Sequence, residues 1–313
     1  MKTTVTIAIP VFNGEQYLLE ALQSTAKQTI RINEILISDN HSTDRTIEII
    51  KQFIKDHPEL TISLHQNSEN IGVINNFNKC FELCDTNYLL ILGYDDRLKP
   101  DTIEKHLNVF AKRPDLALVG GLFDIIDQDG KVTNIPPKAE TIIFEKGDIL
   151  SFMKKTGFYL QHATIMYNMK CTRNIGFFDT IAIAPDERLN VKHLAKYPIA
   201  QIREGIIESR VHNYQETTFE RQRFEDKKLH FQANLDMAKL ESSPQRKKEL
   251  QKSLKTWIAN QSIAISNNTW TNNEKKYLAL KFWFYGLKIT PKDYLNRYVF
   301  YKVKKPLKRF LNR

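Results

Sequence analysis

The N-terminal part of the chain alternates between short apolar runs and longer segments in which apolar residues recur at helical spacing. The short runs are typical of buried strands, and the longer segments have the period of amphipathic helices. This alternation favours parallel βαβ units over a β-sandwich or a helical bundle. The pattern predicts strands over residues 5–11, 34–38, 60–64, 88–92 and 116–120, and helices over 14–28, 43–55, 73–83 and a stretch beginning near Pro100.

Two of the predicted helices follow residues that suit a helix N-cap. Asn13 precedes the helix over 14–28, and Ser42 precedes the helix over 43–55. Side-chain oxygens of Asn and Ser accept hydrogen bonds from the first free N–H groups of a helix. We therefore expect both residues to cap the helices that follow them.

The pattern changes twice further along the chain. Residues 144–200 mix short helices with short strands, and beyond about Gln215 the sequence is rich in Lys, Glu, Gln and Leu at helical spacing. A break near Pro244 divides this last part. We expect one α/β domain over 1–215 and a basic helical C-terminal extension over 216–313.

The net charge of +10 is concentrated at the end of the chain. Net positive charge can indicate nucleic acid, an anionic membrane surface or a phosphorylated substrate as partner. Here the basic residues alternate with apolar ones, which is typical of a segment at a membrane surface, and a solvated basic tail is the alternative. We expect peripheral membrane contact and no nucleic acid on the basis of Lys302, Lys304, Lys305, Lys308, Arg309 and Arg313.

Other features bear on the compartment of the protein. The first residues lack the pattern of a signal peptide, and no apolar run reaches the roughly 18 residues of a membrane span. The three cysteines, Cys80, Cys84 and Cys171, have no spacing typical of a disulfide framework or a zinc site, so we expect buried thiols. The expected location is the cytoplasm, including the inner face of the cytoplasmic membrane.

Adjacent carboxylates, Asp95 and Asp96, follow the strand predicted over 88–92. Open α/β sheets bind ligands at the carboxyl ends of their strands. Mg²⁺ and Mn²⁺ prefer carboxylate oxygens and also coordinate substrate phosphates. The pair therefore suits a metal–diphosphate site, although a solvated turn before the next helix would look the same.

A second acidic segment runs from Ser38 to Asp44, again after a predicted strand. Asp39 comes first at this edge, and its carboxylate can accept a hydrogen bond from the imide of a nucleobase. We expect Asp39 to bind a ligand, whereas Ser42 has the simpler use of capping.

Five segments in order resemble glycosyltransferase family 2. They are Ile9-Pro10-Val11-Phe12-Asn13, Ser38-Asp39-Asn40-His41-Ser42-Thr43-Asp44, Asn70-Ile71-Gly72, Asn78, and Asp95-Asp96 with Pro100. The resemblance covers about 1–218 and implies a GT-A fold, which is a Rossmann-like mixed sheet flanked by helices. It also implies a nucleotide-sugar donor, a divalent cation (Mn²⁺ or Mg²⁺) and inversion at the anomeric carbon.

The resemblance also implies roles for individual residues. Asp39 would hold uracil or thymine, Asn78 would orient the donor, and Asp95 would be the main metal ligand with Asp96 in support. The sequence departs from the usual Asp-x-Asp of the family, because Gly93 stands where the first acid is common. The residues implied to line the donor nucleotide pocket are Pro10, Phe12, Asn13 and Glu15.

Two later segments complete the resemblance. Relatives often carry an acidic pair after a Gly-x-Phe-Asp segment, and here 176–179 precede Asp186 and Glu187. Asp186 matches the catalytic base of the family, with Glu187 as the second choice; a helix cap or ion-pair partner is the other interpretation of Asp186. Arg210 and His212 match positions that contact the donor phosphate or the metal.

The acceptor implied by the family is a hydroxyl of a glycan or of a polyprenyl-diphosphate-linked oligosaccharide in surface polysaccharide synthesis. Three alternatives remain beside a transferase. A non-catalytic sugar-nucleotide-binding protein is motivated by Gly93. A dinucleotide oxidoreductase lacks support because no Gly-x-Gly-x-x-Gly follows the first strand, and a nucleic-acid-binding protein lacks a recognised motif. A homodimer through the C-terminal helices is a further possibility.

Overall fold

The structure is a computed structural model that describes residues 3–157, 160–180, 185–212, 224–270, 284–285 and 288–289. The chain divides into two compact units, Met1–Gln215 and Glu216–Arg313. In the described part of the chain, no helix is both long enough and apolar enough to cross a membrane. The C-terminal basic segment lies outside the described residues, so the predictions of membrane contact and of a dimer there stay predictions.

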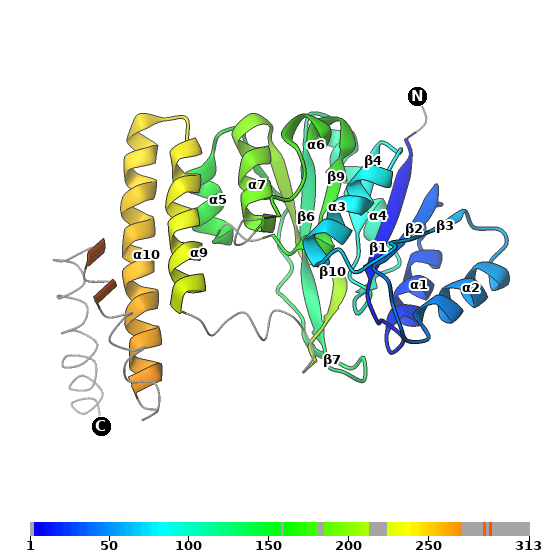
Figure 1. The fold of residues 1–313 in the computed structure, drawn as a ribbon. Coiled ribbons are helices and arrows are strands. Elements are labelled where there is room, and N and C mark those ends of the chain that lie inside the picture. Colours follow the sequence, from blue (N-terminus) through cyan, green and yellow to red (C-terminus); the bar gives the residue numbers. More distant parts are fainter. Residues whose placement is uncertain are drawn as a thin grey trace, which may run out of the picture. The chain divides into compact units, whose positions relative to one another are not determined.

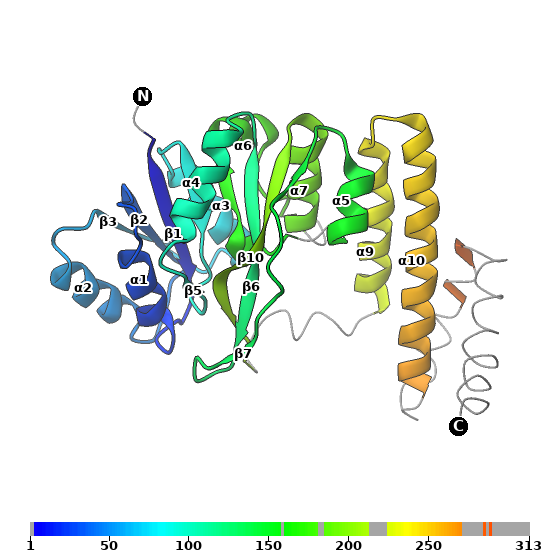
Figure 2. The same ribbon diagram turned by 180° about the vertical axis from the view of Figure 1, so that it is seen from behind.

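The first unit is built on one mixed sheet whose order in the described residues is β3-β2-β1-β4-β9-β6-β10-β5, with β7 beside β6 and β8 beside β10 (Figures 1 and 2). β1, β2, β3 and β4 are mutually parallel along this order, and β6 runs parallel to β10. β9 is antiparallel to both β4 and β6, so β4, β6 and β10 all end at the same edge. The strands are β1 (Val5–Val11), β2 (Glu34–Asp39), β3 (Ile62–Gln66), β4 (Tyr88–Ile91), β5 (Arg97–Leu98), β6 (Leu118–Ile126), β7 (Val132–Asn134), β8 (Ile142–Phe144), β9 (Met166–Asn168) and β10 (Ile199–Arg210).

Helices cover both faces of this sheet, with α3 in front in Figure 1 and α4 in front in Figure 2. The short 3₁₀ helix η1 (His162–Thr164) leads into β9. The helices of this unit are α1 (Leu18–Ala26), α2 (Thr46–Asp56), α3 (Val73–Leu83), α4 (Thr102–Lys112), α5 (Ile149–Thr156), α6 (Met169–Ile175) and α7 (Pro185–Lys196).

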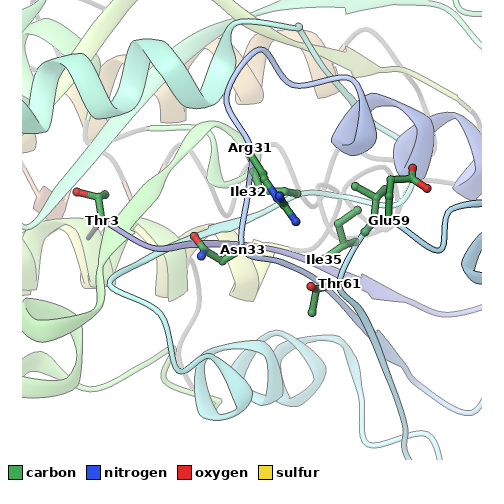
Figure 3. A pocket seen from close by; sticks show the side chains of 8 residues that line it. Thr3, Arg31, Ile32, Asn33, Ile35, Glu59 and Thr61 are labelled. Carbon is green, nitrogen blue, oxygen red and sulfur yellow. The ribbon is translucent and has the colours of Figure 1, made fainter. Parts of the chain in front are cut away.

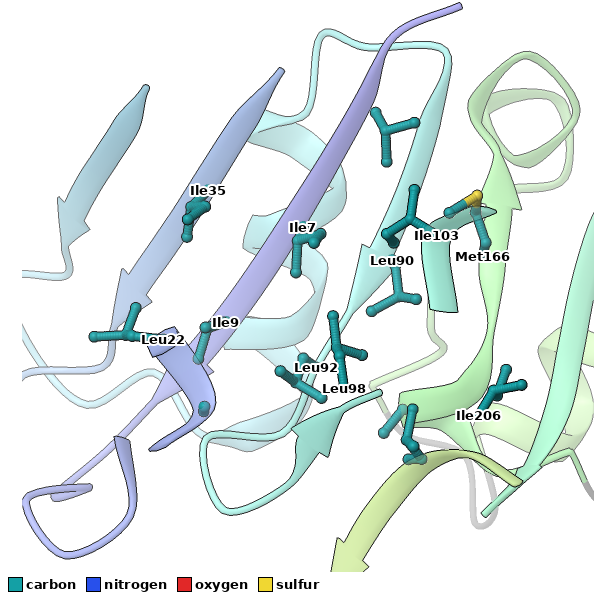
Figure 4. Close-up of a cluster of buried hydrophobic side chains, with 14 of the residues drawn as sticks. Ile7, Ile9, Leu22, Ile35, Leu90, Leu92, Leu98, Ile103, Met166 and Ile206 are labelled. Atoms are coloured by element: carbon teal, nitrogen blue, oxygen red, sulfur yellow. The ribbon is translucent and has the colours of Figure 1, made fainter. Parts of the chain in front are cut away.

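Alternate residues of the central strands enter the two halves of the core. In β1, Ile7 and Ile9 belong to the apolar cluster that also contains Leu22 of α1 and Ile103 of α4 (Figure 4). Ala8 lies between them in sequence and is equally buried, but outside this cluster. Successive side chains of a strand point to opposite faces, and both faces here are covered, which explains why the strands are continuously apolar.

An aromatic cluster lies outside the core of Figure 4. Phe81 of α3 packs edge-on against Tyr167 of β9 at 5.1 Å between ring centroids and stacks on Phe177 at 5.0 Å. Phe178 joins the same cluster at 5.5 Å from Phe81. These contacts tie the segment before α7 to α3.

The strands and helices predicted up to residue 120 follow one another in the structure in the predicted order. β1 and α3 have the predicted bounds, and the strand predicted over 116–120 extends as β6 to Ile126. Cys80, Cys84 and Cys171 are free and buried, as expected.

The predicted helix caps were wrong. α1 begins at Leu18 and α2 at Thr46, and neither has a side-chain cap. Asn13 has a left-handed backbone with φ of 50°, and its Oδ1 accepts a hydrogen bond from Thr43 N. The cap prediction failed because both side chains join neighbouring loops instead of the helices that follow them.

The second unit contains α9 (Phe224–Met237), the short 3₁₀ helix η2 (Ala238–Leu240) and α10 (Pro244–Trp270). Phe231 of α9 and Ile258 of α10 form its described core, with Trp257 edge-on to Phe231 at 5.6 Å. Pro244 starts α10, as expected for a residue that lacks a backbone N–H and suits the first turn.

Candidate active site

The carboxyl ends of β1, β2, β4 and β10 bring most of the predicted residues to one edge of the sheet. Val11 pairs in register with Asp39, and the chain then continues into the loops at 12–17 and 40–45. Asp95 follows β4, and Arg210 ends β10. The topology therefore collects residues that lie nearly 200 positions apart in sequence, as an open α/β sheet does at its ligand-binding edge.

The loops after β1 and β2 are joined by hydrogen bonds in both directions. Asn13 N donates to Ser42 Oγ at 2.9 Å, while Asn13 Oδ1 accepts from Thr43 N at 2.9 Å. Glu15 N donates to Asp44 Oδ2 at 3.0 Å, and Arg45 Nε pairs with Glu15 Oε2 at 3.1 Å. Asn13 and Glu15, predicted to bind the donor, thus shape the rim of the site, and their donor contacts stay predictions.

Asp39 lies beneath this rim. Its carboxylate is fully buried and accepts a hydrogen bond from Ser42 N at 3.2 Å. Pro10 of β1 is also buried, whereas Phe12 exposes 38% of its surface at the same edge. An exposed aromatic ring and a carboxylate at one sheet edge suit a nucleobase, which can stack on a ring and donate to a carboxylate.

An asparagine network that the sequence did not reveal supports this edge. Asn67 Nδ2 donates to Asn40 Oδ1 at 3.1 Å and to Asn76 Oδ1 at 3.0 Å. Asn76 Nδ2 donates to Ser38 O at 2.9 Å, and Asn40 Nδ2 donates to Asn70 Oδ1 at 2.8 Å. The network fixes the ends of β2 and β3 and the start of α3, and Asn residues in sequence give no periodic signal that would have identified it.

Asp95 and His212 form a hydrogen-bonded pair at this edge. Asp95 Oδ2 lies 3.1 Å from His212 Nε2, and both side chains are largely shielded, with 19% and 6% of their surface exposed. A pair of ligands at neighbouring positions of an octahedral Mg²⁺ or Mn²⁺ site is about 3 Å apart, given metal–ligand distances near 2.1 Å. The separation of this hydrogen-bonded pair is therefore also one that two ligands of a single cation can have.

Asp96 points elsewhere. Its Oδ1 accepts a hydrogen bond from Arg210 N at 2.9 Å, and the residue is buried. Burial and the adjacent charge of Asp95 raise the pKa of Asp96 to about 8. In this geometry the carboxyl group of Asp96 binds the end of β10. A contact of Asp96 with a metal stays a prediction.

Asp95 and His212 fit a divalent cation whose remaining ligands come from a bound substrate and water. The described part of the chain contains no group of three or more His, Cys, Asp or Glu side chains arranged around one metal position. Asp95 and His212 supply two ligands of suitable chemistry, and Mg²⁺ and Mn²⁺ commonly take their remaining oxygens from substrate phosphates and water. The site therefore fits a cation that arrives with a diphosphate.

Arg210 is placed under the site rather than in it. Its side chain has no exposed surface. Nε donates to Asp95 O at 2.9 Å, Nη1 to Gln128 O at 3.1 Å, and Nη2 pairs with Glu20 Oε2 at 2.7 Å. In this arrangement the guanidinium binds protein carbonyls, and its predicted contact with the donor phosphate stays a prediction.

Glu20 and Tyr17, which sequence analysis did not identify, belong to the same contact set. The Tyr17 ring centroid lies 4.4 Å from Arg210 Cζ and 5.3 Å from the His212 ring centroid. The segments that resemble the family do not contain these two positions, so only their spacing of three residues at the start of α1 could have indicated a joint role.

Asn78 anchors the segment that leads to the predicted base. Its Nδ2 donates to Phe178 O at 2.9 Å, and its Oδ1 accepts from Phe178 N at 2.9 Å. Both ends of the amide are thus used by one backbone unit. A direct donor contact of Asn78 stays a prediction, and the structure gives the residue a part in positioning residues 176–179.

Asp186 lies in the first turn of α7, beside Glu187. Burial raises the pKa of Asp186, while the backbone N–H groups at the helix start oppose this shift. The charge of Asp186 in turn adds to burial in raising the pKa of Tyr167. A carboxylate whose proton affinity is raised by burial suits a general base near neutral pH. The role itself stays a prediction.

A pocket of about 360 Å³ lies at the opposite edge of the sheet (Figure 3). It is formed where β1, β2 and β3 begin, and none of the predicted site residues lines it. Its lining consists of Thr3, Arg31, Ile32, Asn33, Ile35, Glu59, Leu60 and Thr61. This pocket is therefore separate from the candidate active site.

Curated relatives cover parts of the chain. Chondroitin synthase of Escherichia coli is 34% identical over 128 residues, which is 41% of this chain and 18% of the relative. The dolichyl N-acetyl-alpha-D-glucosaminyl phosphate 3-beta-D-2,3-diacetamido-2,3-dideoxy-beta-D-glucuronosyltransferase of Methanococcus voltae is 29% identical over 206 residues, 61% of each chain. The matched segment thus spans less than two thirds of either relative.

Solved structures share the fold. S. aureus TarS 1-349 in complex with UDP-GlcNAc has a TM-score of 0.66 at 14% identity, covering 96% of this chain and 92% of that chain. The mannosyltransferase PcManGT from Pyrobaculum calidifontis, in complex with GDP-Man and Mn²⁺, has a TM-score of 0.59 at 14% identity, covering 94% and 88%. The predicted GT-A fold, a mixed sheet flanked by helices, is confirmed.

The sequence profile of Glycosyl transferase family 2 matches residues 6–172, more than half of the chain. This range contains the loops after β1 and β4, the end of β2 and the whole of α3, where the predicted donor residues Phe12, Asp95, Asp39 and Asn78 stand. The chain therefore belongs to glycosyltransferase family 2.

Proposed function

We propose that this glycosyltransferase moves a sugar from a uridine-diphosphate donor to an acceptor hydroxyl, with inversion at the anomeric carbon. The observation that carries the proposal is the sheet edge itself, where the buried Asp39 carboxylate ends β2 and the Asp95–His212 pair follows β4 and β10, which end at the same edge. This arrangement offers one position for a base and another for a diphosphate. TarS in complex with UDP-GlcNAc, which shares the fold, supports the choice of a uridine donor.

The acceptor we propose is a glycan or a polyprenyl-diphosphate-linked oligosaccharide of surface polysaccharide synthesis. A chondroitin synthase and a dolichyl-phosphate-linked sugar transferase among the relatives support this class. We place the reaction in the cytoplasm, at the inner face of the membrane, where such an acceptor would be presented.

In the proposed reaction, Asp186 accepts the proton of the acceptor hydroxyl as its oxygen attacks the anomeric carbon. The bond from that carbon to the diphosphate oxygen breaks, and the electron pair leaves with the nucleoside diphosphate. Asp95 and His212 would hold Mn²⁺ or Mg²⁺, which when bound neutralises charge that develops on the diphosphate. Glu187 stands next to Asp186 as the second choice of base.

The test is release of nucleoside diphosphate from a panel of sugar nucleotides, with and without Mn²⁺ or Mg²⁺. Asp95→Ala is compared with Asp85→Asn, an exposed carboxylate away from the site. Cation-dependent release from one donor, lost in Asp95→Ala and kept in Asp85→Asn, supports the proposal. Donor binding without release under any condition, even with candidate acceptors, favours a non-catalytic sugar-nucleotide-binding protein, and failure to bind any nucleotide contradicts both.

A further inference from the structure

Two side chains at the start of α1 contact Arg210 and His212. Tyr17 immediately precedes the helix, and Glu20 lies in its first turn. Residues three apart on a helix are neighbours on its surface. Glu20 contacts Arg210, the last residue of β10, and Tyr17 contacts both Arg210 and His212, which follows the strand.

Glu20 joins two arginines. Its Oε2 lies 2.7 Å from Arg210 Nη2 and 3.0 Å from Arg97 Nη1. Arg97 in turn pairs with Glu208 of β10 at 2.7 Å and donates to Gly130 O at 2.8 Å. One carboxylate therefore connects β5, β10 and the turn after β6.

Arg210 links Glu20 to the backbone of Asp95. Its Nε donates to Asp95 O, and its Nη1 donates to the carbonyls of Asp127 at 3.3 Å and Gln128 at 3.1 Å. The backbone N–H of Arg210 also donates to Asp96 Oδ1. The position of the segment 95–96 is thus fixed from two sides by one buried residue.

The charge of Arg210 requires compensation. Its side chain is fully buried, and a buried charge without a partner is strongly unfavourable. Glu20 supplies negative charge 2.7 Å from Arg210 Nη2, whereas the carbonyls supply dipoles. Neutralising Glu20 is therefore expected to shift the guanidinium and, with it, the Asp95 carbonyl that it holds.

Tyr17 contacts His212, the second member of the Asp95–His212 pair. Its ring lies against the Arg210 guanidinium and is tilted by 42° to the His212 ring, which leaves Nε2 of His212 directed at Asp95. Tyr17 itself is buried. Loss of the ring would leave His212 without this lateral support.

We propose that Glu20 and Tyr17 are positioning residues that set the distance between Asp95 and His212 and thereby the cation affinity of the donor site. The inference rests on the proposed function, since it assigns the pair to a cation. Groups that orient metal ligands typically change metal affinity by about 10- to 100-fold when they are replaced.

The experiment measures Mn²⁺ binding to the full chain at saturating UDP, by electron paramagnetic resonance of free Mn²⁺. Glu20→Gln is compared with Glu48→Gln, which makes the same change at an exposed residue in the first turn of α2. We expect Mn²⁺ affinity to fall about tenfold in Glu20→Gln and to stay within twofold in Glu48→Gln. Equal affinities in wild type, Glu20→Gln and Glu48→Gln overturn the role of Glu20.

A second pair keeps the test decisive if Glu20→Gln unfolds, which circular dichroism would reveal. Tyr17→Leu removes the ring, and Tyr17→Phe retains it. We expect weaker Mn²⁺ binding in Tyr17→Leu and recovery of most of the affinity in Tyr17→Phe, since stacking needs only the ring. A Tyr17→Leu variant that folds and binds Mn²⁺ like the wild type overturns the role of Tyr17.

The outcome for the wild type separates this inference from the function on which it rests. Wild-type protein that binds no Mn²⁺ with UDP contradicts the proposed cation site itself. Wild-type protein that binds Mn²⁺ tightly, with all four variants unchanged, leaves the proposed function standing and removes only the positioning role.

Discussion

Single residues of the candidate site divide into those that we propose to bind a ligand and those that bind protein backbone groups. Asp39, Asp95 and His212 stand at the edge with chemistry for a nucleotide and a cation. Arg210 and Asn78 direct their polar atoms to backbone groups. Sequence motifs identify both kinds, because a motif records which residue types occur together and not which way their side chains point.

Asp39 provides the first prediction at this scale. Asp39→Asn is expected to weaken UDP binding by roughly 10- to 100-fold, since hydrogen bonds to a charged group contribute about 1.5–3 kcal/mol. The measurement is titration calorimetry with UDP and Mn²⁺, with Asp85→Asn as the control. Unchanged UDP affinity in Asp39→Asn would remove the carboxylate from the nucleobase contact.

Gly93 illustrates what the sequence alone left open. A Cβ at this position would lie 2.9 Å from Asp95 Oδ1 and 3.3 Å from Asp96 Oδ2. The first acid of the usual family motif would therefore crowd the Asp95 carboxylate as it is placed here. Only the backbone path of residues 93–96 makes this visible, and the path depends on contacts with distant β10.

Among the elements, α7 carries a pH-sensitive residue. His193 is buried, with Nδ1 2.8 Å from Leu189 O and Nε2 3.0 Å from Thr172 Oγ1. Burial lowers its pKa from the ordinary value of 6.5 to about 4. The unfolded chain therefore binds a proton at a higher pH than the folded chain does.

Neutral His193 therefore makes its full contribution to the free energy of unfolding above about pH 6.5, and this contribution is lost as the pH falls towards 4. At pH 5 the loss is about 2 kcal/mol, at 1.36 kcal/mol per pH unit. Burial also lowers the pKa of His106 and of His162. The part of the pH effect that belongs to His193 is therefore the difference between wild type and His193→Gln. Urea unfolding at pH 7.5 and pH 5 should give a smaller pH effect in the variant; an equal effect in both proteins contradicts this assignment.

β10 contains an irregularity that depends on a glycine. The register against β6 shifts on either side of Gly205, and a Cβ there would overlap Asp124 Oδ1. Asp124 is buried and pairs with Lys99 at 2.7 Å. Little room exists for either group to move.

Gly205→Ala is accordingly expected to lower the free energy of unfolding by about 1–3 kcal/mol, as overpacking of a tight interior does. Urea unfolding provides the measurement, and the same change in an Asp124→Ala background should cost less, because the crowded atom is gone. An identical cost in both backgrounds would show that Asp124 is not the obstacle.

Element order was predictable from the sequence, whereas several element ends were not. The apolar runs of β1 and β4 and the helical spacing of α3 follow from burial on a layered sheet, which leaves a local pattern. The starts of α1 and α2 were missed because Asn13 and Ser42 bond across loops, which no local window contains. Likewise, the contacts of Glu20 with Arg97 and Arg210 join residues more than 70 and 180 positions apart.

At the scale of the whole molecule, the proposed donor site and the proposed base lie on different elements of the first unit. The proposed donor residues lie at the ends of β1, β2 and β4, and the segment before α7, which carries Asp186, is bound to α3 by the Asn78–Phe178 hydrogen bonds. We therefore propose that Asp186 serves the chemistry and that the residues at the strand ends serve donor binding. These two roles are separable by experiment.

The measurement that tests this account most directly compares Asp186→Asn with wild type in donor turnover and in donor binding. We predict that sugar transfer, followed as nucleoside diphosphate release at saturating donor, falls at least about 100-fold, within the range of general-base contributions. The dissociation constant for the donor nucleotide should stay within twofold. Full turnover in Asp186→Asn would contradict the assignment of the base, and a parallel loss of binding would contradict the separation of chemistry from the donor site.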